Sequence, residues 1–257
     1  MKRLVPGVAL AIGLACAACA APTKLWEVRG LDAPESVVLD PGSNALYVSN
    51  VAGSVMEKDG DGFISKLSPD GKMLERNWLT GLNGPTGLTI TNGKLYAADI
   101  DELVEIDIAS AKVLQRYAAK DAKFLNDVTS DSNGTVYASD MATNTIWIWR
   151  LKDGSFEPWL QGDDLNGPNG LVIDGSRLIV ASFGKLPTDN EDGKPGTLLA
   201  ISLDDKSLTK AAGGAPIGNL DGLALVSPDT YLATDWPKGS LYSISAEGSV
   251  EELKDLN

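Results

Sequence analysis

The chain has 257 residues, a formal net charge of −13, two cysteines and no histidine. The negative charge repels nucleic acid and anionic membrane surfaces, so neither is an expected partner. Without histidine, His-based catalytic triads and His-ligated zinc, copper or haem are excluded. Any catalysis must therefore use carboxylates, amides, hydroxyls or a hard metal ion.

Residues 1–20 have the pattern of a secretory signal peptide. Two basic residues precede an apolar run of small and branched residues, and an Ala-Cys-Ala cleavage motif ends at Ala20. The run is too short and too rich in small residues for a membrane-spanning helix. We therefore expect an exported, periplasmic or extracellular protein without membrane insertion. A lipid anchor through Cys16 or Cys19 is an alternative.

Residues 21–257 form the expected folded domain, and they repeat one unit five times. Each unit begins with a short apolar strand, a turn rich in Gly, Asn, Asp or Pro, and a second strand rich in Tyr, Val, Leu and Ala. These strand pairs occupy residues 33–50, 84–99, 124–140, 167–182 and 219–235. The third strands read FISKLSP, ELVEIDI, TIWIWRL, TLLAISL and SLYSISA, and an edge-like fourth strand follows each.

Four short strands in roughly 40–50 residues, without helical periodicity, are typical of β-propeller blades. An irregular β-sandwich is the alternative fold. It has no reason, however, to repeat a polar residue at one fixed place in every unit. The sequence therefore predicts an all-β propeller with five four-stranded blades.

Two insertions, at residues 51–62 and 183–196, lengthen the first and fourth units. Both follow a second strand, so we expect both to lie over one mouth of the ring. The first contains DGDG, which resembles part of an EF-hand loop. Counting from Glu57, however, the twelfth position is Ser68 rather than Glu, and no helix is expected before it. A hairpin connection is the better interpretation.

One position near the start of each first strand is polar and varies in chemistry between units. The five residues at this position are Glu35, Thr86, Asn126, Asn169 and Asp221. Because first strands line the central channel of a propeller, these side chains are expected to meet at one mouth. Facing carboxylates repel, and a hard cation relieves both the repulsion and the cost of burial.

The five side chains offer only oxygen donors, which favour Ca²⁺ over a transition metal and over Mg²⁺, although another divalent ion is possible. The alternative is that they cap strand ends and bond to neighbouring blades.

Four stretches carry a resemblance to a known family: PESVVLD, LNDVTSDSNGTVYASD, GPNGLVID and LDGLAL, in this order along the chain. From about Lys24 onward the chain resembles the gluconolactonase / senescence-marker-protein family of calcium-binding six-bladed propellers, and more distantly the paraoxonases and diisopropylfluorophosphatase. The resemblance implies that Glu35, Asn169 and Asp221 bind one divalent ion. It also implies that Asn126, beside Asp127, contacts metal or substrate.

The chain departs from the family in two ways. Lactonases of the family that act on sugar acids often carry an Arg two residues before the Asn-Asp pair, where this chain has Phe124. We therefore expect Phe124 to face the entrance as a substrate contact and to favour apolar acyl or aryl groups. The histidines of the paraoxonases are absent, so a His-based proton relay cannot operate.

The resulting expectation is a secreted, calcium-dependent hydrolase of lactones or related esters. Asp221 or Asp127 would serve as general base or nucleophile, and Asn126 would orient the substrate carbonyl. A non-catalytic propeller with a structural ion, binding a ligand or a protein, is the main alternative. A metal-free, strictosidine-synthase-like propeller is a third, which the Glu/Asn/Asp set disfavours.

The number of units is the last expectation. Five units are present where the family has six, and residues 24–30 would supply at most one outer strand. The sequence therefore predicts either a C-terminal truncation or an open ring with a gap one blade wide.

Overall fold

The computed structural model describes residues 23–186, 188 and 193–255. The predicted signal peptide and both cysteines lie outside these residues. The described chain forms five four-stranded antiparallel sheets and one two-stranded hairpin. No helix among the described residues is long and apolar enough to cross a membrane.

Each sheet runs from an inner strand to a strand at the rim. The first contains β1 (Pro34–Asp40), β2 (Ala45–Asn50), β3 (Gly62–Leu67) and β4 (Met73–Leu82), and the second contains β5 (Pro85–Thr91), β6 (Lys94–Asp99), β7 (Glu102–Asp107) and β8 (Lys112–Ala118). The third contains β9 (Leu125–Ser130), β10 (Val136–Asp140), β11 (Thr145–Trp149) and β12 (Phe156–Gln161). The fourth contains β13 (Pro168–Asp174), β14 (Arg177–Ser182), β17 (Leu198–Ser202) and β18 (Leu208–Lys210), with the hairpin β15 (Gly184–Lys185) and β16 (Lys194–Pro195) inserted. The fifth contains β19 (Leu220–Ser227), β20 (Thr230–Asp235), β21 (Ser240–Ser245) and β22 (Val250–Asp255).

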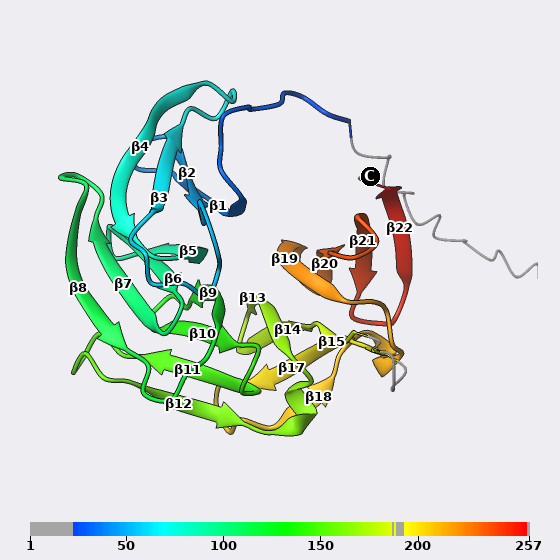
Figure 1. Cartoon of the computed structure of the whole chain (residues 1–257). Coiled ribbons are helices and arrows are strands. Elements are labelled where there is room, and N and C mark those ends of the chain that lie inside the picture. The colour runs from blue at the N-terminus through cyan, green and yellow to red at the C-terminus, as the bar shows by residue number, and fades with distance from the viewer. Residues whose placement is uncertain (1–22, 187, 189–192, 256–257) are drawn as a thin grey trace, which may run out of the picture.

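The five sheets radiate from a common axis, as Figure 1 shows, which confirms the predicted β-propeller of five four-stranded blades. Consecutive inner strands pack on one another, from β1 to β5, β9, β13 and β19. The ring is open between the first and fifth sheets, and the N-terminal segment runs along the outside of this opening. The relation to a six-bladed family and the C-terminal truncation both remain predictions.

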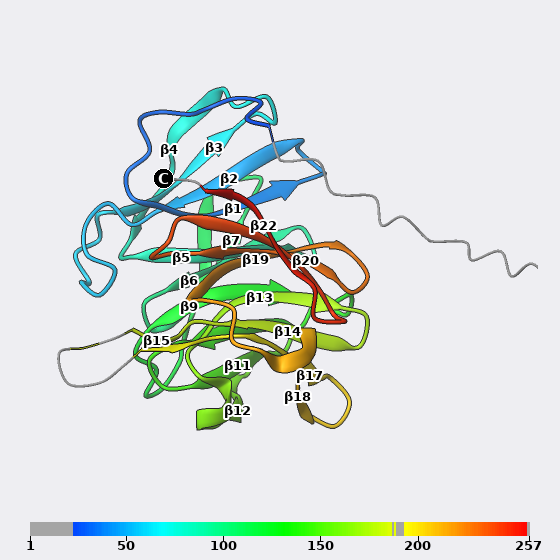
Figure 2. The same cartoon turned by 90° about the vertical axis from the view of Figure 1, so that its right-hand side faces the viewer.

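Local sequence explains the tight connections between strands. Asn92 and Gly93 form the two-residue turn between β5 and β6, and both have positive φ angles, as a type I′ hairpin turn requires. The insertion at residues 51–62 connects β2 to β3 without any helix, in agreement with the hairpin interpretation. Figure 2 shows this loop and the β15–β16 hairpin projecting from the same side of the ring.

Four apolar clusters fill the four interfaces between consecutive sheets. In the first, Tyr47 packs on Trp78 with ring centroids 4.5 Å apart, and Leu88 of the second sheet joins them. Burial of these large side chains supplies most of the stabilisation in a domain without disulfides. The core therefore lies between the sheets and leaves the axis free for polar residues.

Polar residues at the ends of second strands hold the segments that lead into the inner strands. Asp99 accepts hydrogen bonds from the backbone N–H groups of Asn83 and Gly84. Asp140 does the same for Lys123 and Phe124. In the first sheet, the side-chain oxygen of Asn50 accepts from the N–H of Asp32. These contacts fix the backbone immediately before the residues of the mouth.

We expect Asp140→Ala to lower the free energy of unfolding by about 2–3 kcal/mol, because it leaves buried N–H groups without a partner. Urea denaturation monitored by tryptophan fluorescence measures the change. Asp153→Ala, which removes an exposed turn aspartate, is the matched control and should cost no more than about 0.5 kcal/mol. Equal stability of the two variants would contradict this role of Asp140.

Candidate functional site

A cavity of about 520 Å³ follows the channel from the start of the inner strands. All five inner strands line it, and β20 and β21 of the fifth sheet add Leu232, Thr234 and Leu241. The five residues predicted to meet at the mouth all belong to its lining: Glu35, Thr86, Asn126, Asn169 and Asp221. The structure thus brings the predicted polar ring together.

A β-bulge at the start of each inner strand places these side chains. The register between inner and second strand shifts between Pro34 and Val37 in the first sheet, and at the same place in the other four. A bulge leaves backbone groups unpaired and re-aims a side chain. The Pro-X-Gly frame around Asn169 therefore marks the bend that turns its amide toward the axis.

Hydroxyl groups on the second strands bond to the backbone freed by these bulges. Ser49, Ser139 and Thr234 accept hydrogen bonds from the N–H groups of Ser36, Asp127 and Gly222, the residues that follow the ring position, at 2.9–3.0 Å. Sequence reasoning missed these hydroxyls. The signal was present as a recurring Ser or Thr just before the Asn or Asp that ends the second strand.

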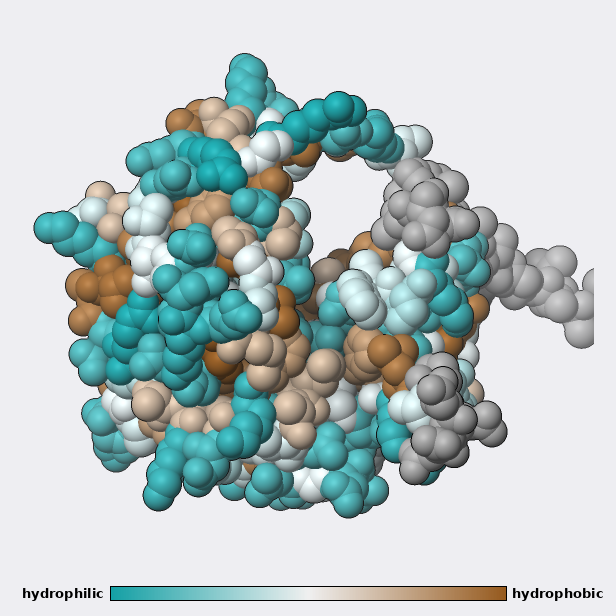
Figure 3. All heavy atoms as spheres, in the orientation of Figure 1, coloured by the Kyte–Doolittle hydropathy of each residue, from teal (hydrophilic) through white to brown (hydrophobic). Residues whose placement is uncertain are grey.

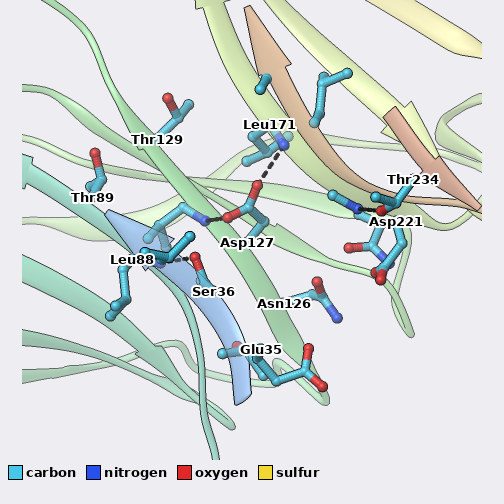
Figure 4. Close-up of a pocket in the computed structure, with 18 of the residues that line it drawn as sticks. Glu35, Ser36, Leu88, Thr89, Asn126, Asp127, Thr129, Leu171, Asp221 and Thr234 are labelled. Atoms are coloured by element: carbon cyan, nitrogen blue, oxygen red, sulfur yellow. Dashed lines mark hydrogen bonds between the residues drawn. The ribbon is translucent and has the colours of Figure 1, made fainter. Parts of the chain in front are cut away.

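Glu35 and Asp221 are the two carboxylates of the mouth, and they face the same space as Asn126 (Figure 4). Partial desolvation, and then the charge of Asp221, raise the pKa of Glu35. Desolvation also raises the pKa of Asp221, and the amide of Asn169, which donates to its Oδ1 at 2.9 Å, partly offsets this. None of the ion pairs among the described residues involves either carboxylate.

Thr86 has a different role from the other members of the ring. Its side chain is buried, and its hydroxyl donates to the carbonyl of Leu125 on the next inner strand at 3.1 Å. This is the bond between neighbouring blades that the alternative interpretation proposed for the whole ring. Thr86 is therefore a structural contact.

Asp127 lines the cavity one residue beyond Asn126, but both of its carboxylate oxygens are engaged. Oδ1 accepts from the N–H of Val128 at 2.8 Å, and Oδ2 accepts from the N–H of Leu171 on β13 at 2.7 Å. Burial raises the pKa of Asp127 to about 7, although these two bonds oppose the rise. Asp127 thus ties β9 to β13 beneath the mouth.

Phe124 is half-buried and precedes β9, and it is not among the residues that line the cavity. Its backbone N–H donates to Asp140 Oδ1 at 3.2 Å. The structure gives no support to a contact between Phe124 and a ligand in this cavity.

The chemistry of the mouth fits a hard cation. Two carboxylates that pair with no cationic side chain of the described residues lie beside the amides of Asn126 and Asn169, and such oxygen donors suit Ca²⁺. Three acidic, His or Cys side chains do not come together in a metal-binding cluster anywhere in the described part of the chain. The donor set at the mouth is therefore two carboxylates completed by amide oxygens.

Comparison with known proteins supports the fold. No family model matches the chain, and no curated protein matches it. Among solved structures, virginiamycin B lyase from Staphylococcus aureus aligns with a TM-score of 0.59 and 13% identity, over 84% of this chain and 68% of that one. A chain of the nidogen/laminin complex aligns with a TM-score of 0.63 and 14% identity, over 87% of this chain and 79% of that one.

A catalytically inactive variant of the same lyase, with quinupristin, aligns with a TM-score of 0.57 and 12% identity, over 85% of this chain and 83% of that one. These neighbours are β-propeller proteins, and at such low identity they show the fold alone. None of these three structures is a gluconolactonase, so the resemblance of the four stretches to that family stays a prediction.

The raised pKa of Asp127 predicts a pH dependence of stability. The folded protein holds this proton more tightly than the unfolded chain, whose Asp pKa is about 4, so the contribution of Asp127 to stability is fully present below about pH 4 and is lost as the pH rises through about 7. Glu35 and Asp221 act in the same direction. With chelator present, the Tm should be lower at pH 8 than at pH 5, and Asp127→Asn should flatten part of this slope.

Thermal unfolding followed by circular dichroism between pH 4 and pH 8 measures the effect. Asp153→Asn, on an exposed turn, is the control and should keep the slope of the unmodified protein. An unchanged slope in Asp127→Asn would show that this carboxyl does not titrate near neutral pH.

Proposed function

We propose that this protein is an exported hydrolase that binds Ca²⁺ at the mouth of its channel and opens lactones or related esters. The observation that carries the proposal is the pair of carboxylates of Glu35 and Asp221 at the entrance of a cavity, which form no ion pair with any cationic residue in the described part of the chain. Export rests on the sequence of residues 1–20. The five sheets are taken as the greater part of a six-bladed ring.

Glu35, Asp221, Asn126 and Asn169 would hold the ion, and the same donors would accept another divalent cation. When bound, it supplies stabilisation of the negative charge that develops on a substrate carbonyl oxygen. The described residues provide no competing positive charge for these carboxylates, since none of the ion pairs includes them. The amide of Asn126, which makes no side-chain hydrogen bond within the described part of the chain, is free to orient the carbonyl group of a substrate.

Asp221 is the preferred general base. Its Oδ1 is oriented by Asn169. Desolvation raises its pKa in the metal-free site, but a bound cation would lower it again, so Asp221 would act as a weak base suited to lactones and activated esters rather than amides. In the proposed reaction, Asp221 accepts a proton from the attacking water as the new C–O bond forms, and returns it to the leaving alkoxide. Asp127 is the weaker candidate, because both of its oxygens already accept backbone N–H groups.

Part of the cavity wall favours an apolar group on the substrate. Leu88, Leu223, Leu232 and Leu241 belong to its lining. An aryl or alkyl portion of an ester would bury apolar surface there, and the hydroxyl groups of Thr89, Thr129 and Thr234 in the same lining would accommodate the polar part of the substrate. The preference that sequence reasoning assigned to Phe124 is thus assigned to these leucines.

A non-catalytic binding propeller with a structural ion is the second candidate. The engagement of Asp127 and Asn169 in hydrogen bonds within the protein favours it, because such groups also serve a purely structural site. The fold does not decide between the hydrolase and the binding propeller, because the solved structures that share it include both a lyase and a chain from a nidogen/laminin complex.

Added calcium should raise the Tm of the unmodified protein relative to chelator, more at pH 7 than near pH 4, where the two carboxylates take up protons. Glu35→Gln and Asp221→Asn should each remove most of this increase, because they keep the shape and delete the charge. Glu157→Gln at the rim is the matched control. Equal Tm values of the unmodified protein in calcium and in chelator would contradict the metal site.

Activity is tested with a panel of aryl esters and of alkyl and sugar-acid lactones, with calcium and with chelator. We expect calcium-dependent turnover of the apolar members, with kcat lowered about 100-fold or more in Asp221→Asn. Asn126→Ala should raise KM as well as lower kcat. Calcium binding without turnover of any member would favour the binding propeller over the hydrolase.

A further inference from the structure

Further along the inner strands, the cavity has a second polar level. Three residues beyond the ring position, the second and third sheets carry Thr89 and Thr129, both half-buried and both in the lining of the cavity. The other three sheets carry Val38, Val172 and Ala224 at this position. At this position, hydroxyl groups are therefore confined to two neighbouring inner strands, β5 and β9.

The hydroxyl of Thr129 is free to bind a ligand, because it makes no hydrogen bond within the described part of the chain. The hydroxyl of Thr89 lies 3.1 Å from that of Ser130, and this contact orients it. A hydroxyl offers one donor and two acceptor positions, so one bond leaves Thr89 with further capacity. The two threonines can therefore donate to, and accept from, a polar group that reaches them.

An apolar belt separates the two polar levels. It consists of Leu88, Val128, Leu171 and Leu223, which stand two residues beyond the ring position and line the cavity. Asp127 is the charged residue within this belt, and both of its carboxylate oxygens already accept backbone N–H groups. The belt therefore offers a ligand mainly apolar contacts, which suit a hydrocarbon chain.

The two polar levels lie at a definite spacing along the channel. Figure 4 shows Glu35 and Asn126 on one side of Asp127, and Thr89 and Thr129 on the other. Three residues of a β-strand span about 10 Å, which is the expected separation of the levels. In the space-filling view the ring is hollowed between the first and fifth sheets, so small molecules can enter it (Figure 3). A ligand that matches this channel is polar at both ends and apolar between them.

We propose that Thr89 and Thr129 bind a distal hydroxyl group of the ligand, about 10 Å from a carbonyl group held at the mouth. Two neutral hydroxyls suit a neutral group better than an ion, because burying a charge without a partner is expensive. The substrate class for the proposed hydrolysis is then an ester or lactone with a hydroxylated acyl chain. The inference rests on the proposed function for the placement of the carbonyl beside Asn126.

The first test measures binding alone, with two amides that the weak base of this site is not expected to hydrolyse. Nonanamide carries a methyl group where ω-hydroxyoctanamide carries its hydroxyl. NMR titrations of the full chain in calcium give the two Kd values. We expect the hydroxy amide to bind about threefold to tenfold more tightly, because it gains one hydrogen bond.

The variants assign this preference to the two hydroxyls. Thr129→Val keeps the shape of the side chain and should remove most of the preference, and the double variant with Thr89→Val should remove all of it. Thr129→Ser keeps a hydroxyl and should retain it. Thr230→Val on β20, which is not among the residues that line the cavity, is the matched control and should bind like the unmodified protein.

Equal binding of the two amides, no binding of either, or a preference that survives in the double variant overturns the proposal. Aryl esters of nonanoic and ω-hydroxyoctanoic acid then separate it from the proposed hydrolysis, since kcat/KM should favour the hydroxy ester by about the same factor. A preference for the hydroxy amide without turnover of either ester would support the distal site and contradict the hydrolase. Equal kcat/KM for both esters, with equal binding of the amides, would support the hydrolase and overturn the distal site.

Discussion

The β-bulge at the start of every inner strand is the feature on which the rest of the site depends. An unbroken strand would alternate its side chains between the two faces of its sheet, toward the neighbouring blades. The bulge breaks this alternation at one residue and turns that residue toward the axis. Second-strand hydroxyls and the carboxylates that end those strands then hold the freed backbone. The polar ring is thus a consequence of backbone geometry repeated in five sheets.

The electrostatic character of the site follows from this convergence. Five strands deliver side chains to one mouth, and two of these side chains carry negative charge. Desolvation raises the pKa of both carboxylates, and the charge of Asp221 raises that of Glu35 further, so burial of these charges destabilises the ring at neutral pH. The polar groups of Thr86 and Asp127 avoid the cost of unpaired burial in a different way, because each forms a hydrogen bond with the backbone of a neighbouring inner strand. The mouth therefore combines groups already satisfied by protein with groups that suit a cation.

Much of the fold was predictable because it repeats. Strand spacing, turn residues and one recurrent polar position gave five four-stranded blades and the members of the ring, which the structure brings together. The sequence raised hydrogen bonds to neighbouring blades as an alternative role for the whole ring, but it could not tell that Thr86 alone, and Asp127 beside the ring, would have this role, because that depends on the distance between strands of different sheets. Phe124 illustrates the same limit: its distance from the Asn-Asp pair along the chain does not say which way it points from the segment before β9.

The central claim is that the carboxylates of Glu35 and Asp221 hold a divalent cation at the mouth of the channel. The most direct measurement is a crystal structure of the protein grown with calcium, with anomalous diffraction used to locate the ion. We predict one anomalous peak on the axis, about 2.3–2.6 Å from oxygens of both side chains. Well-ordered density for both side chains, with only water or nothing between them, would contradict the claim.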